Sequence, residues 1–186
     1  MCVVGVDFGA SGAAIVLDDN LNVINSLLFD KVNSISQAAL FFIDYKEFPF
    51  IVEKVGAAYG DGGKSLFSFG KNVGRFSAAI EISQAQVFEI PPQAWTAYYK
   101  AKYRDSFTAA AAENKLRNEI FVRNVFGDPL NKFYGRSRYH SGAVDAYLIA
   151  RYGILNLNKI LEKEKKQTEK DLRKSKAKAA PRASYI

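Results

Sequence analysis

Three short apolar runs separated by tight turns open the chain, and they restrict its possible folds more than any other feature. The runs cover residues 3–6, 13–17 and 21–29, and each of the first two is followed by an aspartate. Apolar runs of this length, with glycine-rich or polar turns between them, are typical of strands joined in sequence. We therefore expect an antiparallel meander at one side of a sheet.

Two helix–strand pairs follow these runs. Ser34 is a suitable N-cap for a helix over residues 35–45, and the buried strand 50–52 comes next. A second helical pattern covers residues 65–83 and precedes the strand 86–90. Strands that alternate with helices favour parallel pairing. The combined pattern predicts an α/β fold in which a mixed five-stranded sheet is flanked by helices.

The remaining body is predicted to be helical. A short helix begins at Pro92 and carries Trp95, and Thr108 is expected to cap an alanine-rich helix. Ser141 is expected to cap the last well-packed helix, over residues 142–157. In the long helix 65–83, Gly70 and Gly74 lie four residues apart, so we expect them to allow close packing against a neighbour.

We expect one domain over residues 1–157 and a basic, flexible tail over residues 158–186. Ten basic and four acidic residues lie between Lys159 and Arg182, so the tail carries most of the net charge of +7. A polyanionic partner explains this charge, and so does a solvated tail that aids solubility. The single cysteine, Cys2, excludes an internal disulfide framework.

The sequence also favours the cytoplasm. No apolar stretch approaches the roughly 20 residues of a membrane helix. The chain opens on a strand-like segment instead of the charged and apolar regions of a signal peptide. We therefore expect a cytoplasmic protein without membrane association.

Two carboxylates end apolar runs that the pattern assigns to strands. Asp7 follows the first run and Glu53 follows the strand 50–52. If these strands are parallel neighbours, they lie about 4.8 Å apart and bring both carboxylates within reach of one cation. Two anions at that distance need a cation or a proton between them. The alternative is a pair of unrelated surface acids.

A third carboxylate belongs to the last helix. Asp145, Leu148, Ile149 and Tyr152 follow the i, i+3, i+4, i+7 spacing of one helical face. An unpaired carboxylate on a buried face is costly, so Asp145 requires a partner. A metal ion shared with the two strand-end acids is one possibility, and a structural hydrogen bond is the other. His140, the only histidine, lies five residues earlier and is either a ligand or acid–base group or a structural residue.

Five segments in order along the chain resemble the RuvC-like Holliday junction resolvases of the ribonuclease H-like superfamily, especially the phage-type members. They are GVDFGASGA at 5–13, VE at 52–53, SLFSFGK at 65–71, PPQAW at 91–95 and VDAYLIA at 144–150. Each motif is weak alone, but five at compatible spacing over residues 3–153 are specific. The resemblance implies the ribonuclease H-like fold, whose element order the predicted strands and helices share.

The resemblance further implies a homodimer that binds four-way DNA junctions and nicks two opposed strands with Mg²⁺ or Mn²⁺. Asp7, Glu53 and Asp145 match the family's acids. The family usually has a fourth Asp or His three or four residues before the last Asp, where this chain has Gly142 and Ser141. We expect His140 to take that place. A site of three carboxylates with more water ligands, or reduced activity, are the alternatives.

By the same resemblance, an ion held by Asp7 and Asp145 would activate water, and an ion between Asp7 and Glu53 would stabilise the leaving 3′ oxygen. DNA phosphates are expected to contact five basic side chains, Lys64, Lys71, Arg75, Arg136 and Arg138. Tyr59, in a glycine-rich loop, is either a stacking platform for unpaired bases or an ordinary loop aromatic.

Three other functions are compatible with the sequence. The turn after Asp7 also resembles the phosphate-binding turn of the actin, Hsp70 and sugar-kinase superfamily, whose members need two such domains. A DNA-binding protein with weak or no catalysis is the second alternative. A nuclease for flaps, forks or RNA is the third. The family resemblance favours the junction nuclease, in a bacterium or a phage-infected host cell.

Overall fold

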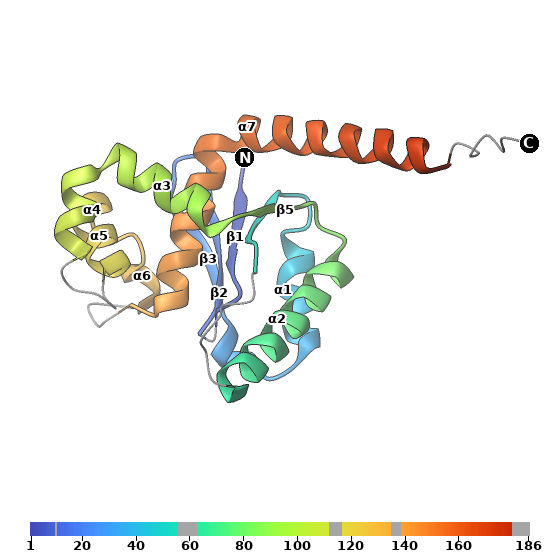
Figure 1. The fold of residues 1–186 in the computed structure, drawn as a ribbon. Helices are drawn as coiled ribbons and strands as arrows, with labels where there is room; N and C mark the ends of the chain where they lie inside the picture. Colours follow the sequence, from blue (N-terminus) through green and yellow to red (C-terminus); the bar gives the residue numbers. More distant parts are fainter. Residues whose placement is uncertain (10, 56–62, 112–116, 135–138, 180–186) are drawn as a thin grey trace, which may run out of the picture. The chain divides into compact units, whose positions relative to one another are not determined.

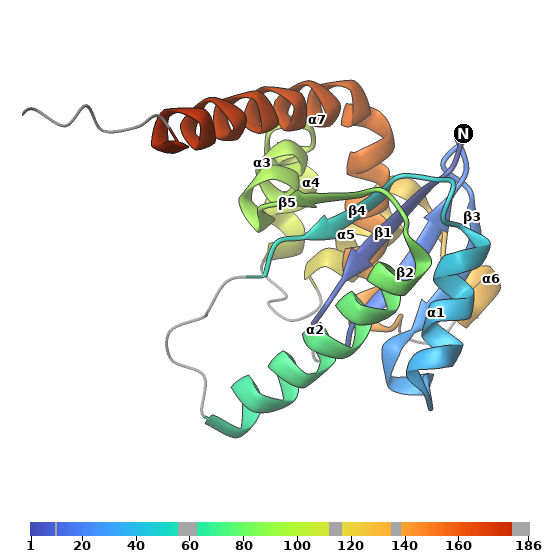
Figure 2. The ribbon, with the colours of Figure 1, turned by 90° about the vertical axis from the view of Figure 1, so that its right-hand side faces the viewer.

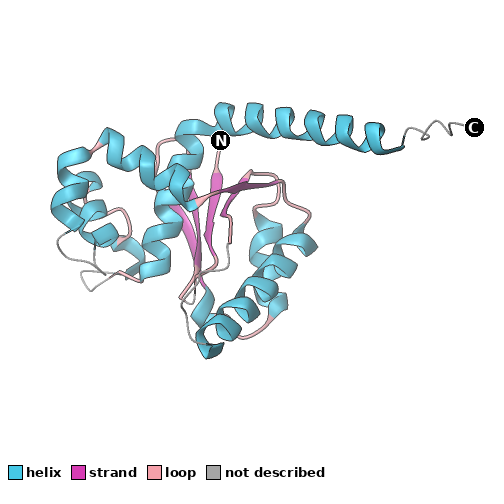
Figure 3. Ribbon diagram, viewed as in Figure 1, coloured by secondary structure: helices cyan, strands magenta, loops and turns pink. Residues whose placement is uncertain are grey.

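A computed structural model describes residues 1–9, 11–55, 63–111, 117–134 and 139–179. The chain divides into two units, Met1–Leu155 and Asn156–Ile186. The first unit contains a five-stranded sheet with helices on both faces, as Figures 1 and 3 show. The helix-flanked sheet predicted from the sequence is thus confirmed.

The sheet places its first and fourth strands side by side, in the order β3-β2-β1-β4-β5. The strands are β1 Val3–Asp7, β2 Ala13–Leu17, β3 Val23–Leu28, β4 Phe50–Glu53 and β5 Val87–Ile90. β1 pairs antiparallel with β2 and parallel with β4, and β4 pairs parallel with β5. The sheet is therefore mixed, and its N-terminal half is the predicted meander.

Helices fill both faces of this sheet. They are η1 Phe29–Lys31, α1 Ile35–Asp44, α2 Gly63–Ser83, α3 Pro92–Lys102, α4 Arg104–Ala111, α5 Arg117–Phe126, α6 Asn131–Tyr134 and α7 Ser141–Ala179. Ser34 caps α1 as predicted, since its Oγ accepts a hydrogen bond from the Gln37 amide at 3.1 Å. Ser141 is the first residue of α7 instead of its cap, and the His140 carbonyl accepts from the Val144 amide.

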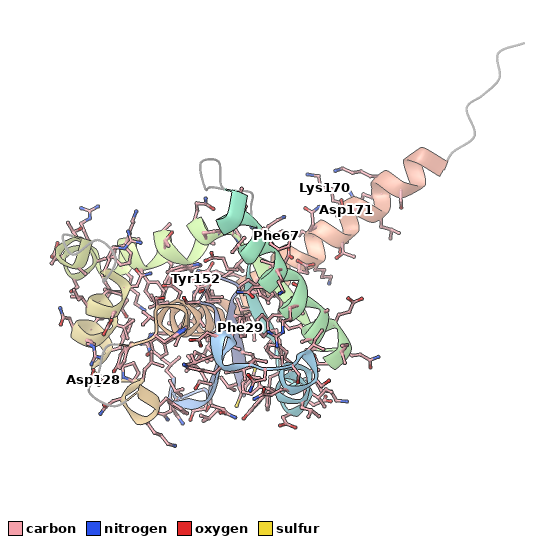
Figure 4. All side chains as sticks on the ribbon, turned by 90° about the horizontal axis from the view of Figure 1, so that it is seen from below. Phe29, Phe67, Asp128, Tyr152, Lys170 and Asp171 are labelled. Atoms are coloured by element: carbon pink, nitrogen blue, oxygen red, sulfur yellow. The ribbon has the colours of Figure 1, made fainter. Side chains whose placement is uncertain are left out.

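Two layers of side chains separate the helices from the sheet. Val4 and Val6 of β1 belong to a core that includes Phe42 of α1 and Phe76 of α2. Phe29 stacks on Phe76 in this core, with ring centroids 3.7 Å apart, and Figure 4 shows Phe29 among the packed side chains. Because side chains alternate along a strand, the odd-numbered positions of β1 face the other layer. Figure 2 shows α1 and α2 together on one side of the sheet.

Gly5 allows α7 to lie directly against β1. A Cβ at position 5 would collide with the backbone of Ala146 and of Ala150, both in α7. Farther along the same helix, a Cβ at Gly153 would collide with the Ile51 side chain of β4. Gly5 of β1 and Gly153 of α7 therefore allow the N-terminal half of α7 to pack closely against β1 and β4.

Two sequence-based expectations are wrong. A Cβ at Gly70 or Gly74 would meet no described atom within 4 Å, so these glycines are not sites of close packing. Both glycines lie at exposed positions of α2, where a helix tolerates glycine at a small cost in stability. Thr108 lies inside α4 instead of capping a helix, because α4 already begins at Arg104.

The second unit is the C-terminal part of α7. The helix has non-helical backbone angles at Asn156, near the predicted end of the packed helix, and helical backbone continues to Ala179. Residues 161–175 are all exposed. This stretch is rich in Glu and Lys, which favour helix without a buried face. Among the described residues, none of the helices is both long and apolar enough to cross a membrane.

We predict opposite effects of adding one methyl group at two glycines. Gly5→Ala should lower the free energy of unfolding by about 1–3 kcal/mol or more, because the β1–α7 backbone contact cannot absorb a Cβ. Gly74→Ala should raise it by up to about 1 kcal/mol, because alanine favours an exposed helix. Urea unfolding measures both. Equal stabilities of the two variants would contradict the close approach.

Candidate active site

Two of the predicted carboxylates leave the sheet at the same edge. Val6 of β1 is in register with Val52 of β4, so Asp7 and Glu53 occupy neighbouring strand ends. Asp7 shares its face of the sheet with Gly5, two residues earlier, which is the face that contacts α7. The predicted parallel pairing that brings these two acids together is confirmed.

Asp145 reaches the same edge from α7. It precedes Ala146, whose carbonyl lies against Gly5, and it is partly buried. Val144, Ala146, Leu148 and Ile149 around it are fully buried or nearly so. The close contact between α7 and β1 therefore holds Asp145 beside the strand-end acids.

The three carboxylates act on one another electrostatically. Burial and the negative charges of Asp145 and Glu53 raise the pKa of Asp7 to about 8, against an opposing hydrogen bond from Gly9. Burial and Asp145 also raise the pKa of Glu53. Burial raises the pKa of Asp145, although Asn118 and Arg117 oppose it. Like charges in a desolvated site favour a bound proton or cation.

Each carboxylate has its own neutral hydrogen-bond donor. The Gly9 amide donates to Asp7 Oδ1 at 2.8 Å, and Trp95 Nε1 donates to Glu53 Oε2 at 2.7 Å. Asn118 Nδ2 donates to Asp145 Oδ1 at 2.5 Å. These bonds orient the acids without neutralising them. Trp95 belongs to a motif noted in the sequence, whereas Asn118 had no local signal, since only folding brings α5 beside α7.

The donor set suits a hard divalent cation. Mg²⁺ and Mn²⁺ prefer carboxylate oxygens, and three carboxylates supply the negative charge that such an ion requires. Among the described residues, no group of three or more His, Cys, Asp or Glu side chains is gathered closely enough to hold an ion.

His140 pairs with a fourth acid. Its Nε2 lies 3.5 Å from Asp30 Oδ1, in η1, and its side chain is 17% exposed. Its Nδ1 is buried and has no described hydrogen-bond partner. The role of His140 at the carboxylates stays a prediction.

The structure explains why Gly142 stands where the resemblance leads one to expect an acid. A Cβ at Gly142 would collide with the carbonyl of Ser11, in the turn after β1. The same turn contains Gly12, whose amide donates to the Gly9 carbonyl at 2.9 Å and whose own carbonyl accepts from the Phe29 amide. The start of α7 and this turn thus pack backbone against backbone, and no side chain fits between them.

Most of the predicted DNA-binding side chains are untested by the structure. Tyr59, Arg136 and Arg138 lie outside the described residues, as does the side chain of Lys64. Lys71 is exposed on α2. Arg75 already has a structural role, because its guanidinium donates to the Val32 carbonyl at 2.9 Å and lies over the Phe76 ring.

Comparison with known proteins defines the fold class. No protein-family model and no curated protein sequence matches the chain. The mixed five-stranded sheet flanked by helices is a ribonuclease H-like fold of the RuvC kind. The structure of T. thermophilus RuvC in complex with a Holliday junction substrate aligns with 85% of this chain and 95% of that chain, with 14% identity and a TM-score of 0.53. A second Thermus thermophilus RuvC structure covers 85% and 96%, with 14% identity and a TM-score of 0.49.

The raised pKa of Asp7 predicts a pH-dependent stability. The folded chain keeps the Asp7 proton up to about pH 8, whereas the unfolded chain releases it near the ordinary value of 3.8. The wild type should therefore lose stability relative to Asp7→Asn as the pH rises from about 4 to 8, by on the order of a few kcal/mol. Urea unfolding in EDTA measures this difference.

A cation should remove much of that difference by stabilising the wild type alone. Asp44→Asn, at the exposed end of α1, is the matched control and should follow the wild type. An Asp7→Asn variant less stable than the wild type at pH 8 in EDTA would contradict the electrostatic coupling of the acids.

Proposed function

We propose that this chain is a divalent-cation-dependent endonuclease that nicks branched DNA, with four-way junctions as its preferred substrate. The observation that carries the proposal is the meeting of Asp7, Glu53 and Asp145 from β1, β4 and α7, where two of them raise the pKa of the third. The ribonuclease H-like fold adds support, since a RuvC with this fold has been solved with a Holliday junction substrate. The short motifs resemble phage-type members.

The three acids would hold Mg²⁺ or Mn²⁺ through their carboxylate oxygens. When bound, the cation lowers the pKa of water and offsets charge on the phosphate and leaving oxygen. Trp95 and Asn118 keep two of the acids in place through their N–H donors. Asp7 contacts the Gly9 amide, so the turn after β1 orients the central acid.

Symmetric cleavage requires a second copy of the chain. Each chain carries a single cluster of these three acids, and two nicks on opposed strands need two clusters related by a two-fold axis. We therefore propose a homodimer that acts in the cytoplasm of a bacterium or of a phage-infected host cell. A DNA-binding protein with weak catalysis is the second candidate, because Gly142 leaves no room for a fourth acid at its position.

We expect Asp7→Asn and Asp145→Asn to lower junction nicking by at least about 100-fold, because each removes a negative ligand from the cation site. The assay is single-turnover cleavage of labelled four-way junction, flap and linear duplex in Mg²⁺ and in Mn²⁺. Asp44→Asn should cleave as the wild type does. Junction binding without nicking by the wild type in either metal would favour the second candidate, and nicking that survives Asp7→Asn would exclude the mechanism.

We also propose His140 as the fourth group of the site, oriented by Asp30. His140→Ala should then lower nicking by roughly 100-fold, the usual loss for a general acid or base. Asp30→Asn should have a smaller effect, because it alters only the orientation of the ring. Thermal unfolding of both variants controls for stability. Unchanged nicking by His140→Ala would remove His140 from the site.

A further inference from the structure

Three helices on the α7 side of the sheet form an open pocket, one of whose lining residues is connected to Asp145 through Asn118. The pocket has a volume of about 500 Å³ and lies among α3, α4 and α5. Its lining residues are Ala97, Lys100, Ala101, Arg104, Phe107, Thr108 and Arg117. Three of these seven are cations and none is an acid, so the pocket has the electrostatic character of an anion site.

Two of the three cations, Lys100 and Arg104, have no acidic partner among the described residues, whereas the charge of Arg117 acts on Asp145. Lys100 and Arg104 are exposed, and among the described residues no ion pair joins either of them, or Arg117, to a carboxylate. Asp105 is adjacent to Arg104 in the chain but does not line the pocket. Arg123 of α5 differs, because it pairs with Glu119 and Asp128.

Arg117 connects this pocket to the candidate active site. Its guanidinium lies 5.1 Å from the centre of the Phe107 ring, and its Nε donates to Asn118 Oδ1 at 3.3 Å. Asn118 in turn donates to Asp145, and the charge of Arg117 lowers the pKa of that acid. A side chain that lines the pocket is thus two hydrogen bonds away from one of the three carboxylates.

We infer that the pocket lined by Lys100, Arg104 and Arg117 binds backbone phosphates of the DNA strand that enters the carboxylate site. The inference rests on the proposed function and names the surface that would hold its substrate. Phosphodiesters fit the pocket because the exposed cations Lys100 and Arg104 form no ion pair with a described carboxylate. Contacts to backbone phosphates carry no sequence information, so this binding is independent of sequence.

The surface differs from that expected from the sequence alone. Arg75 anchors α2 to the Val32 carbonyl, on the opposite face of the sheet, whereas the three-cation pocket lies on the face that carries Asp145. A strand held there would place a phosphate near the acids without crossing the sheet. The charges of Lys100 and Arg104 are exposed and available for this role.

The test is the salt dependence of junction binding. Fluorescence anisotropy in EDTA would measure the affinity of a labelled four-way junction over a series of salt concentrations, for wild type, Lys100→Gln, Arg104→Gln and the double variant. Each lost phosphate contact should reduce the slope of log K against log salt by about 0.9, and the double variant should lose about twice that. Lys46→Gln, an exposed change of equal charge after α1, is the matched control and should keep the wild-type slope.

Glutamine preserves helix propensity at both exposed positions, and thermal unfolding would confirm that the variants fold. A wild type that binds the junction, with variants that keep its slope, overturns this inference and leaves the proposed function intact. A wild type that does not bind branched DNA overturns both. Lower slopes for the pocket variants, but not for Lys46→Gln, support the inference.

Discussion

Helix α7 approaches strand β1 more closely than any side chain at position 5 would permit, and the candidate site depends on this contact. Gly5 lies against the backbone of Ala146 and Ala150. Gly5 is two residues before Asp7 in β1, and Ala146 directly follows Asp145 in α7. Backbone contact has little freedom to adjust, so the distance between strand and helix is fixed. Asp7 and Asp145 are therefore held together by packing, despite their mutual repulsion.

Packing also brings a neutral hydrogen-bond donor to each of the three acids. Three partly buried carboxylates without a cation are electrostatically unfavourable, in keeping with the raised pKa of Asp7. The fold offsets part of this cost with an amide, an indole and a carboxamide, each donating to one acid. None of these groups carries charge, so the site keeps its negative potential. A stable fold thus maintains a site whose charge favours a cation.

Helices α3, α4 and α5 have both a structural and an electrostatic role. Tyr99 of α3 donates to the Leu148 carbonyl of α7 and packs on Phe121 of α5, which ties these helices to the site. The same helices place Lys100, Arg104 and Arg117 around one pocket. A nuclease requires acids that bind the metal and, close to them, cations that attract the phosphates of the substrate. The three acids at the strand ends and the cations of the pocket meet this requirement.

The sequence by itself determined the order of strands and helices, the positions of Asp7 and Glu53 at strand ends, and the place of Asp145 on a buried helical face. These features depend on local periodicity, which the sequence displays directly. Only the tertiary structure decided that Asn118 holds Asp145, that His140 pairs with Asp30, and that Gly5 and Gly142, instead of Gly70 and Gly74, are the sites of close approach. Each of these contacts joins residues far apart in the chain, so no local pattern specifies them.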